Sequence, residues 1–266
     1  MKHFTGKLKV QDLIADALAN EIIPNIVSSK VAMSSQKPYT PLSNKRREQF
    51  LADFCDVLIS ADKDNAMRMT EEVLRGGISV TDLFLGVYTD SARLLGEMWV
   101  KDICSFGDVT IGLTILHDLV RQNIQPLGAE LEQTRHETFI CLSPIPGQEH
   151  VFGTFMLEAF LLAKGHNVET SLAQTREVFL NNIATNKYSI IALSVAEDNQ
   201  VKACKQLIQS IRNMSFNQDI TILVGGYPFI QNDGLYLDVG ADATADNALQ
   251  ALEVIETICN DRMQIN

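Results

Sequence analysis

Short apolar, β-rich runs alternate with helical stretches through the second half of this 266-residue chain. The runs lie at 139–142, 167–169, 189–193 and 220–224, and helical spacing fills the intervals between and after them. Parallel strands need a crossover connection, usually a helix, and because they are covered on both faces they are nearly continuous in apolar residues. The pattern therefore predicts an α/β domain with a parallel sheet over residues 138–266.

The preceding region, 44–131, shows helical apolar spacing throughout. Its expected helices are one around Phe50–Leu58, one over Asp62–Arg75, one over Thr81–Trp99 and one that begins at Asp108 as its N-cap. Short connections between four such helices predict an all-α four-helix bundle. Residues 1–43 form a separate segment, with helical spacing over 10–27 followed by a linker rich in Ser, Lys, Pro and Gln.

Charge and cysteine usage narrow the function classes. The formal net charge of −11 opposes binding to the phosphate backbone of nucleic acid, so a protein or small-molecule partner is expected rather than direct DNA binding. No apolar run approaches the ~20 residues that cross a membrane, and the N-terminus lacks the features of a signal peptide. The five cysteines are scattered without C-x-x-C spacing, which disfavours disulfides and zinc and indicates the reducing cytoplasm.

A histidine stands in the loop after the first predicted strand, where the next helix begins. Ligands of parallel α/β sheets bind beyond the carboxyl ends of the strands, and this loop reads Gln148-Glu149-His150-Val151-Phe152-Gly153. The glycine three residues after the histidine allows a ligand to approach the backbone closely. Two other strand ends carry Ser194-Val195 and Gly225-Gly226.

These elements, in this order, resemble cobalamin-binding domains and their D-x-H-x-x-G motif, together with a G-A-D turn at Gly240-Ala241-Asp242. The resemblance covers roughly residues 138 to 260 and implies a flavodoxin-like (Rossmann-like), five-stranded sheet with cobalamin as cofactor. It implies that His150 is the lower ligand of cobalt. The cofactor-binding residues that it implies around this ligand and the nucleotide tail are Gln148, Glu149, Val151, Phe152, Gly153, Ser194, Val195, Gly225 and Gly226.

The segment that ends in Leu95-Gly96-Glu97-Met98-Trp99 resembles the bundle that caps cobalamin in corrinoid proteins. This resemblance implies that Trp99 and Thr110 lie near the upper face of the cofactor. Methyl-transfer and photoreceptor relatives carry a Glu-His pair where this chain has Val109 and Thr110, and an aspartate where it has Gln148. The Gln148 amide can still accept a hydrogen bond from the second nitrogen of His150, but it contributes no charge.

With these departures, the stretches 105–113 and 146–153 are most similar to the AerR/PpaA antirepressor family of purple photosynthetic bacteria, whose domain is shared with the C-terminal part of AppA. The similarity implies a non-enzymatic, light- or redox-responsive transcriptional regulator that acts through a partner repressor of the PpsR/CrtJ type. Two alternatives stay open. One is a corrinoid carrier of a methyltransferase system, and the other is a haem-binding sensor of the same fold.

Single residues also admit plainer interpretations. Trp99 could be core packing, and Thr110 an ordinary residue of a first helical turn. His117, on the fourth predicted helix, is expected to be a satisfied surface histidine, although it could face the upper cobalt position. Cys104 is expected to be an inert thiol, because no basic residue adjoins it.

Overall fold

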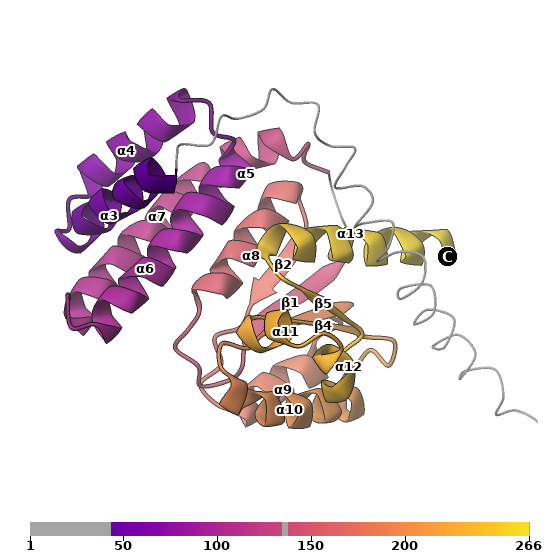
Figure 1. Ribbon diagram of the computed structural model, residues 1–266. Coiled ribbons are helices and arrows are strands. Elements are labelled where there is room, and N and C mark those ends of the chain that lie inside the picture. Colours follow the sequence, from indigo (N-terminus) through magenta and orange to yellow (C-terminus); the bar gives the residue numbers. More distant parts are fainter. Residues whose placement is uncertain (1–43, 135–137, 266) are drawn as a thin grey trace, which may run out of the picture. The chain divides into compact units, whose positions relative to one another are not determined.

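The structure, a computed structural model, describes residues 44–134 and 138–265. The helix and linker predicted within residues 1–43 lie outside the described residues. In Figure 1 the described chain runs from the indigo and magenta helices of its first half to the orange and yellow elements of the sheet.

Four helical segments make up the described chain before Leu131, as the apolar spacing predicted. They are α3 (Asn44–Ile59), α4 (Lys63–Arg75), the continuous run of α5 (Val80–Asp82), the π-helical η2 (Leu83–Tyr88) and α6 (Thr89–Val100), and finally α7 (Phe106–Glu130). Helix α3 packs against α4, α6 and α7, and α6 also packs against α7, so the segments form a bundle. The apolar spacing gave no signal for the six-residue π-helical stretch η2.

The start of α7 differs from the prediction. Ser105, not Asp108, is the N-cap, and its hydroxyl accepts from the backbone N–H of Asp108 at 3.2 Å. The Asp108 carboxylate in turn accepts from the backbone N–H of Ser105 at 2.8 Å. This reciprocal pair is a capping box, and its S-x-x-D spacing places the carboxylate at the third helical position rather than at the cap.

The second half folds as the predicted parallel sheet. Its strands are β1 (Phe139–Pro144), β2 (Asn167–Thr170), β3 (Ile190–Ser194), β4 (Thr221–Gly225) and β5 (Ala243–Ala245). They are all parallel and lie in the order β2-β1-β3-β4-β5. This is the flavodoxin-like order, in which the chain changes direction across the sheet between β1 and β3. The flavodoxin-like prediction is confirmed; β5, only three residues long, followed from the resemblance rather than from an apolar run.

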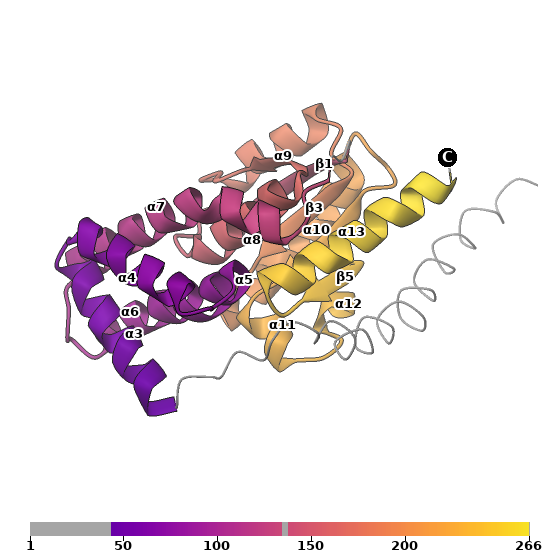
Figure 2. The same ribbon diagram turned by 90° about the horizontal axis from the view of Figure 1, so that it is seen from above.

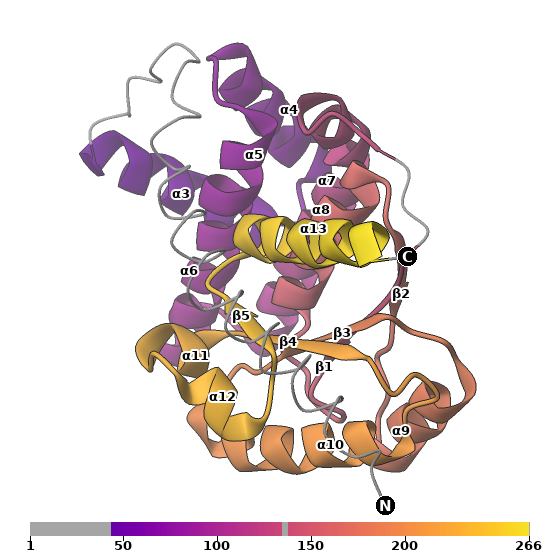
Figure 3. The same ribbon diagram turned by 90° about the vertical axis from the view of Figure 1, so that its right-hand side faces the viewer.

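Helices cover both faces of the sheet (Figure 3). Helices α8 (Phe152–Lys164) and α13 (Ala248–Ile265) lie on one face, and α9 (Arg176–Thr185) and α10 (Val201–Met214) on the other. The buried residues accordingly divide into two clusters, one for each face. Short helices η3 (Asp198–Gln200), α11 (Tyr227–Gln231) and α12 (Leu235–Val239) follow the ends of β3 and β4.

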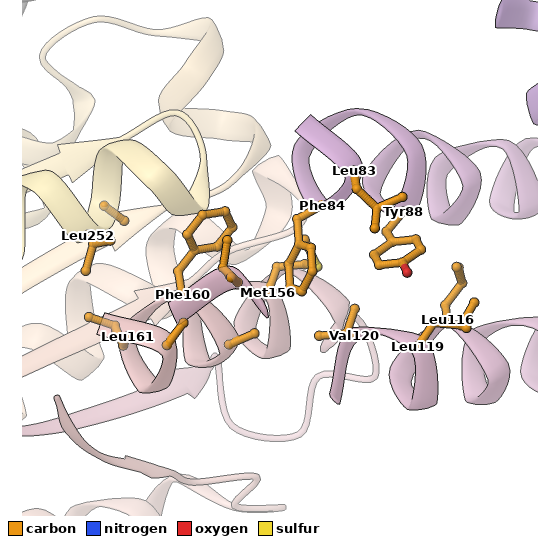
Figure 4. Packing of buried hydrophobic residues seen from close by; sticks show 14 of the residues in the cluster. Leu83, Phe84, Tyr88, Leu116, Leu119, Val120, Met156, Phe160, Leu161 and Leu252 are labelled. Carbon is orange, nitrogen blue, oxygen red and sulfur yellow. The ribbon is translucent and has the colours of Figure 1, made fainter. Parts of the chain in front are cut away.

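The bundle and the sheet share the first of these clusters. Helix α7 packs along α8, as Figure 2 shows from above. Gly128 permits this close approach, because a Cβ there would stand 2.8 Å from the carbonyl oxygen of Ala163. Phe84 of η2 meets Phe160 of α8 edge to face, with ring centroids 5.8 Å apart (Figure 4). This shared core fixes the end of α6 relative to the loop after β1.

No helix in the described parts of the chain is both long and apolar enough to span a bilayer.

Candidate functional site

The carboxyl ends of the strands meet in one row at an edge of the sheet. Pro144 of β1 pairs in register with Ser194 of β3, which pairs with Gly225 of β4, which in turn pairs with Ala245 of β5. Because β1 and β3 flank the point where the strand order reverses, the loops that follow them leave toward opposite faces of the sheet. A crevice at such a point is where doubly wound sheets bind ligands.

The loop after β1 carries His150 to this edge. Gly147 has φ +83°, a conformation that favours glycine, and its N–H donates to the carbonyl of Ala173 at 3.1 Å. The N–H of Gln148 closes a turn on the carbonyl of Ile145 at 3.0 Å. His150 follows this turn and precedes α8 by two residues, and its side chain is 61% exposed. The imidazole therefore stands open at the end of the sheet.

A hollow of about 390 Å³ joins this histidine to the bundle. It is lined by the last turn of α6 and the residue after it, together with the loop histidine: Gly96, Glu97, Trp99, Val100, Lys101 and His150. Trp99 is 46% exposed, so it is not core packing, and its ring lies 5.9 Å from that of Phe106. The fold thus brings the two predicted residues Trp99 and His150 to one hollow from separate elements.

The small residues predicted for a nucleotide tail lie together beyond the strand ends. A Cβ on Gly153 would stand 3.9 Å from the Ser194 hydroxyl, so the first turn of α8 approaches the end of β3. Gly226 has φ +115°, and a Cβ there would stand 2.0 Å from the carbonyl oxygen of Val195. The Val195 side chain is buried, so only the backbone of Val195 lies at this edge. Its N–H donates to the carbonyl of Gly225 at 2.9 Å.

An unsatisfied polar group lies near this edge, among the residues that the structure describes. The hydroxyl of Thr154, in the first turn of α8 beside Gly153, is buried and has no hydrogen-bond partner among the described residues. Buried hydroxyls are usually paired, so such a group is a candidate for contact with a ligand or an ordered water. Sequence reasoning passed over it, because a threonine inside an apolar helical run gives no signal of its own.

Gln148 does not take the role expected for it. Its amide oxygen accepts from the backbone N–H groups of Glu149 at 3.0 Å and His150 at 3.4 Å, so it caps the loop rather than the imidazole. A different side chain reaches the ring: the Oε1 atom of Glu197 lies 3.5 Å from Nε2 of His150. Glu197 was missed by sequence reasoning, although its place three residues beyond the end of β3 was a usable signal.

Other predicted residues lie away from the hollow. The hydroxyl of Thr110 donates to the carbonyl of Phe106 at 2.8 Å, as an ordinary exposed helical threonine does. Because α7 begins at Phe106, Thr110 lies beyond the first turn in which it was expected. The Glu149 side chain is exposed. Val151 precedes α8 as its N-cap without a side-chain hydrogen bond, and the ring of Phe152 turns toward α7. These four residues are not among those that line the hollow.

The expectation of a surface position for His117 is wrong. Its ring is packed between Phe152, at 5.4 Å, and Phe155, at 4.5 Å, and its Nε2 atom is buried without a hydrogen-bond partner among the described residues. It is not among the residues that line the hollow. At Cys104, burial and the neighbouring Asp108 raise the pKa of the thiol, in agreement with the inert thiol that was expected.

Comparison with known proteins identifies the fold. No protein-family model matches the chain. The structure of the monomethylamine corrinoid protein of Methanosarcina barkeri superposes with a TM-score of 0.63 at 15% identity, over 80% of this chain and 99% of that protein. The chain has the fold of a corrinoid protein. The resemblance to cobalamin-binding domains is thereby confirmed at the level of the fold.

The chain is also similar in sequence to proteins of two further organisms. Monomethylamine corrinoid protein 1 of Methanosarcina mazei is 22% identical over 213 residues, which are 75% of this chain and 92% of that protein. A protein of Rhodobacter capsulatus, described as an uncharacterized 20.5 kDa protein in the bchF-crtJ intergenic region, is 20% identical over 177 residues, 66% of this chain and 92% of that protein.

The residues present fit a corrinoid at this edge. His150 offers an exposed imidazole, which is the commonest metal ligand of proteins, into a hollow that also holds an aromatic ring. Gly153, Ser194 and Gly225 leave the strand ends free of bulky side chains. The unpaired hydroxyl of Thr154 adds a polar group that a ligand could satisfy. Among the described residues there is no cluster of three or more His, Cys, Asp and Glu side chains that could hold a metal ion.

Proposed function

We propose that this chain binds cobalamin at the edge of the sheet, with His150 as the lower ligand of cobalt and Trp99 beside the upper face. The observation that carries the proposal is that these two side chains line one hollow, although they belong to a loop of the sheet and a helix of the bundle. Cobalamin supplies a cobalt centre whose upper ligand can be exchanged or lost on illumination. The chain's own residues supply the lower ligand, the aromatic wall and the groove of small residues.

We further propose that the chain is a non-enzymatic, cytoplasmic regulator that responds to light or redox state through a partner repressor. The Rhodobacter capsulatus relative, from the bchF-crtJ region, supports this, because the antirepressor resemblance implies a repressor of the PpsR/CrtJ type as partner. The two residues that stand where methyl-transfer relatives carry a Glu-His pair support it too. Neither has an ionisable group: Val109 is 8% exposed and packs in the bundle core, and the Thr110 hydroxyl is bonded to its own helix.

Regulation requires that the partner distinguish two arrangements of the chain, since a ligand can shift an equilibrium only by its difference in affinity for the two states. The contact between α7 and α8 is suited to carry that difference. Helix α7 is part of the bundle, and α8 begins two residues after His150. A change at the cobalt would thereby alter how the bundle packs on the sheet.

A corrinoid carrier for a methyltransferase is the second candidate. The named corrinoid proteins of Methanosarcina favour it, because both are similar to this chain over most of their length. The two candidates differ in chemistry: a carrier passes a methyl group to an acceptor, and a regulator does not. The relatives with a stated cofactor are corrinoid proteins, so the haem alternative gains no support from them.

The test is reconstitution of the purified chain with methylcobalamin, adenosylcobalamin or haem, followed by absorption spectra before and after illumination. Cobalamin binding through His150 predicts a shifted spectrum that His150→Ala abolishes or changes. An unchanged spectrum in His150→Ala would remove the ligand assignment. Transfer of the methyl group from bound methylcobalamin to a thiol or pterin acceptor would favour the carrier over the regulator.

A further inference from the structure

The helix that carries Trp99 is not wound uniformly along its length. Between α5 and α6 the stretch η2 is π-helical, and the winding returns to α-helical at Thr89. The backbone N–H of Thr89 donates to the carbonyls of Gly86 and Phe84, and its hydroxyl donates to the carbonyl of Phe84 at 2.9 Å. Two donors of one threonine thus meet a carbonyl five residues earlier, which is the hydrogen-bond spacing of a π-helix.

Separate contacts fix the side chains before and after this change of winding. The ring of Phe84 packs edge to face against Phe160 of α8, and Figure 4 shows both rings. Further along the helix, Leu95 and Met98 are buried in the bundle core, and Trp99 lines the hollow. All of these contacts can form together only if α6 has the right rotation relative to η2.

The π-helical stretch supplies that rotation. An α-helix turns by about 100° per residue, and a π-helical turn takes up about one residue more than an α-helical turn. In a run that was α-helical throughout, with Phe84 kept on α8, each residue of α6 would therefore point where its successor points now. Met98 would take the direction of Trp99, and Trp99 would take that of Val100, which is 78% exposed. The tryptophan would leave the hollow for solvent.

We propose that η2 sets the rotation of α6 and that Thr89, through its hydroxyl, is the positioning residue that keeps Trp99 at the hollow. In α-helical winding the N–H of Thr89 would donate to the carbonyl of Leu85, four residues earlier, instead of that of Phe84. The hydroxyl bond to Phe84 favours the π-helical winding by the contribution of one hydrogen bond, about 3-fold to 10-fold in the ratio of the two windings. The placement of Trp99 concerns the chain alone, and its consequence for the cofactor rests on the proposed function.

The first measurement uses the full-length chain without cofactor. Trp99 is the single tryptophan of the sequence, so quenching of its fluorescence by acrylamide reports its exposure directly. Thr89→Val keeps the branched shape of the side chain and removes the hydroxyl. We expect its quenching constant to rise by up to about 1.7-fold, the ratio of the exposed fractions of Val100 and Trp99, 78% and 46%. Circular dichroism checks that the variant is folded.

Thr257→Val is the matched control. The Thr257 hydroxyl, in α13, is also partly buried and donates at the same distance, 2.9 Å, but to the carbonyl of Glu253, four residues earlier. Because that spacing is α-helical, this variant should leave the quenching of Trp99 as it is in the wild type.

Deletion of Gly86 tests the rotation itself. Removal of one residue from η2 lets the stretch wind as an α-helix without turning α6, so Trp99 should stay at the hollow. The same deletion combined with Thr89→Val should return the quenching constant to the wild-type value. A side chain that only stabilised the fold would not be rescued by the loss of a residue.

The second measurement is the dissociation constant for methylcobalamin. We expect binding about 3-fold to 10-fold weaker in Thr89→Val, which is the usual effect of losing one aromatic contact. Thr257→Val and the variant that combines Thr89→Val with the deletion of Gly86 should bind as the wild type does.

The outcomes separate the two proposals. Unchanged quenching in Thr89→Val, an equal rise in Thr257→Val, or a rise that the deletion of Gly86 does not reverse would overturn the role of η2. Should Thr89→Val fail to fold, the deletion variant decides alone, and its unfolding or a changed quenching constant in it would overturn that role too.

If the wild type does not bind methylcobalamin, the proposed function fails, and the fluorescence of the cofactor-free chain still decides the role of η2. If Thr89→Val changes the quenching of Trp99 and leaves the affinity as it is, the role of η2 stands. In that case the position of Trp99 beside the upper face of the cofactor is wrong.

Discussion

The imidazole of His117 stacks on the ring of Phe152, with centroids 5.4 Å apart and planes 16° apart. His117 belongs to α7 of the bundle, and Phe152 opens α8 two residues after His150. This contact is therefore a direct link between the bundle and the loop that carries the candidate ligand. Burial of this ring costs folding free energy, because the Nε2 atom of His117 is buried with no hydrogen-bond partner among the described residues. A cavity of about 20 Å³ adjoins it, lined in part by Arg121 and Glu158.

Substitution of His117 should separate packing from polarity. His117→Ala removes the ring from between Phe152 and Phe155 and leaves a cavity, so we expect it to lower the free energy of unfolding by about 2–4 kcal/mol. His117→Leu fills most of the space and removes the unpaired nitrogen, so its stability should stay close to wild type. Urea denaturation, followed by circular dichroism, measures both. Equal losses in the two variants would show that the nitrogen has a partner, such as a bound water.

The same histidine gives a pH dependence with a defined sign. Burial first, and then the neighbouring Arg121, lower the pKa of His117 below its ordinary value, while Asp118 opposes the shift. Above pH about 6.5 the ring is neutral in both folded and unfolded chains. As the pH falls below that value the unfolded chain takes up a proton that the folded chain does not, so the free energy of unfolding decreases.

The measurement is the difference in unfolding free energy between wild type and His117→Leu at several pH values, which cancels the other titrating groups. Glu158 of α8 and Asp118 and Arg121 of α7 are the charged groups that face or adjoin this histidine. We expect the wild type to lose stability relative to His117→Leu below pH 6.5, with a slope of at most about 1.4 kcal/mol per pH unit. A difference that does not change with pH would contradict the buried, neutral state of His117.

How far the sequence predicts this molecule depends on the range of the interactions. The strands from β1 to β4 and the helices between them follow from apolar periodicity, since burial on both faces of a sheet acts at every position. The S-x-x-D spacing of Ser105 and Asp108 is itself a local signal for a capping box, and it indicates Ser105 rather than Asp108 as the N-cap of α7.

Contacts between separate elements have no comparable signal in the local sequence. Whether Gln148 or Glu197 reaches His150 depends on how two loops pack across the sheet, which no local pattern encodes. The burial of His117 likewise depends on how closely α7 packs on α8, which Gly128 permits. The candidate ligand was predictable because a loop motif carries it, whereas its surroundings required the fold.

Gly153→Ala should separate binding from folding. A Cβ at this position meets only the Ser194 hydroxyl, at the ordinary contact distance of 3.9 Å, and the position is helical. Alanine in a helix is favoured over glycine by about 1 kcal/mol, so the variant should be as stable as the wild type or slightly more so. If the corrinoid approaches the backbone here, its dissociation constant should rise. Unchanged affinity would place the cofactor away from the first turn of α8.

Gly226→Ala should disrupt the edge of the sheet itself. Its φ of +115° is strained for any residue with a side chain, and a Cβ would stand 2.0 Å from the carbonyl oxygen of Val195. Gly234 is the matched control, because it also has a positive φ, +84°, but a Cβ there meets nothing within 4 Å. Gly234→Ala should therefore lose only the cost of the left-handed conformation, about 1–2 kcal/mol.

For Gly226→Ala we expect that same cost plus a backbone displacement, and so a total loss of at least about 3 kcal/mol in the free energy of unfolding. The displacement would move the carbonyl of Val195. The N–H of the same residue donates to the carbonyl of Gly225, which pairs in register with Ser194 at the edge of the sheet. Cobalamin affinity should fall with it, whereas Gly234→Ala should bind as the wild type does. Equal losses of stability in the two variants would mean that Val195 and Gly226, which directly follow β3 and β4, do not approach each other as closely as the structure shows.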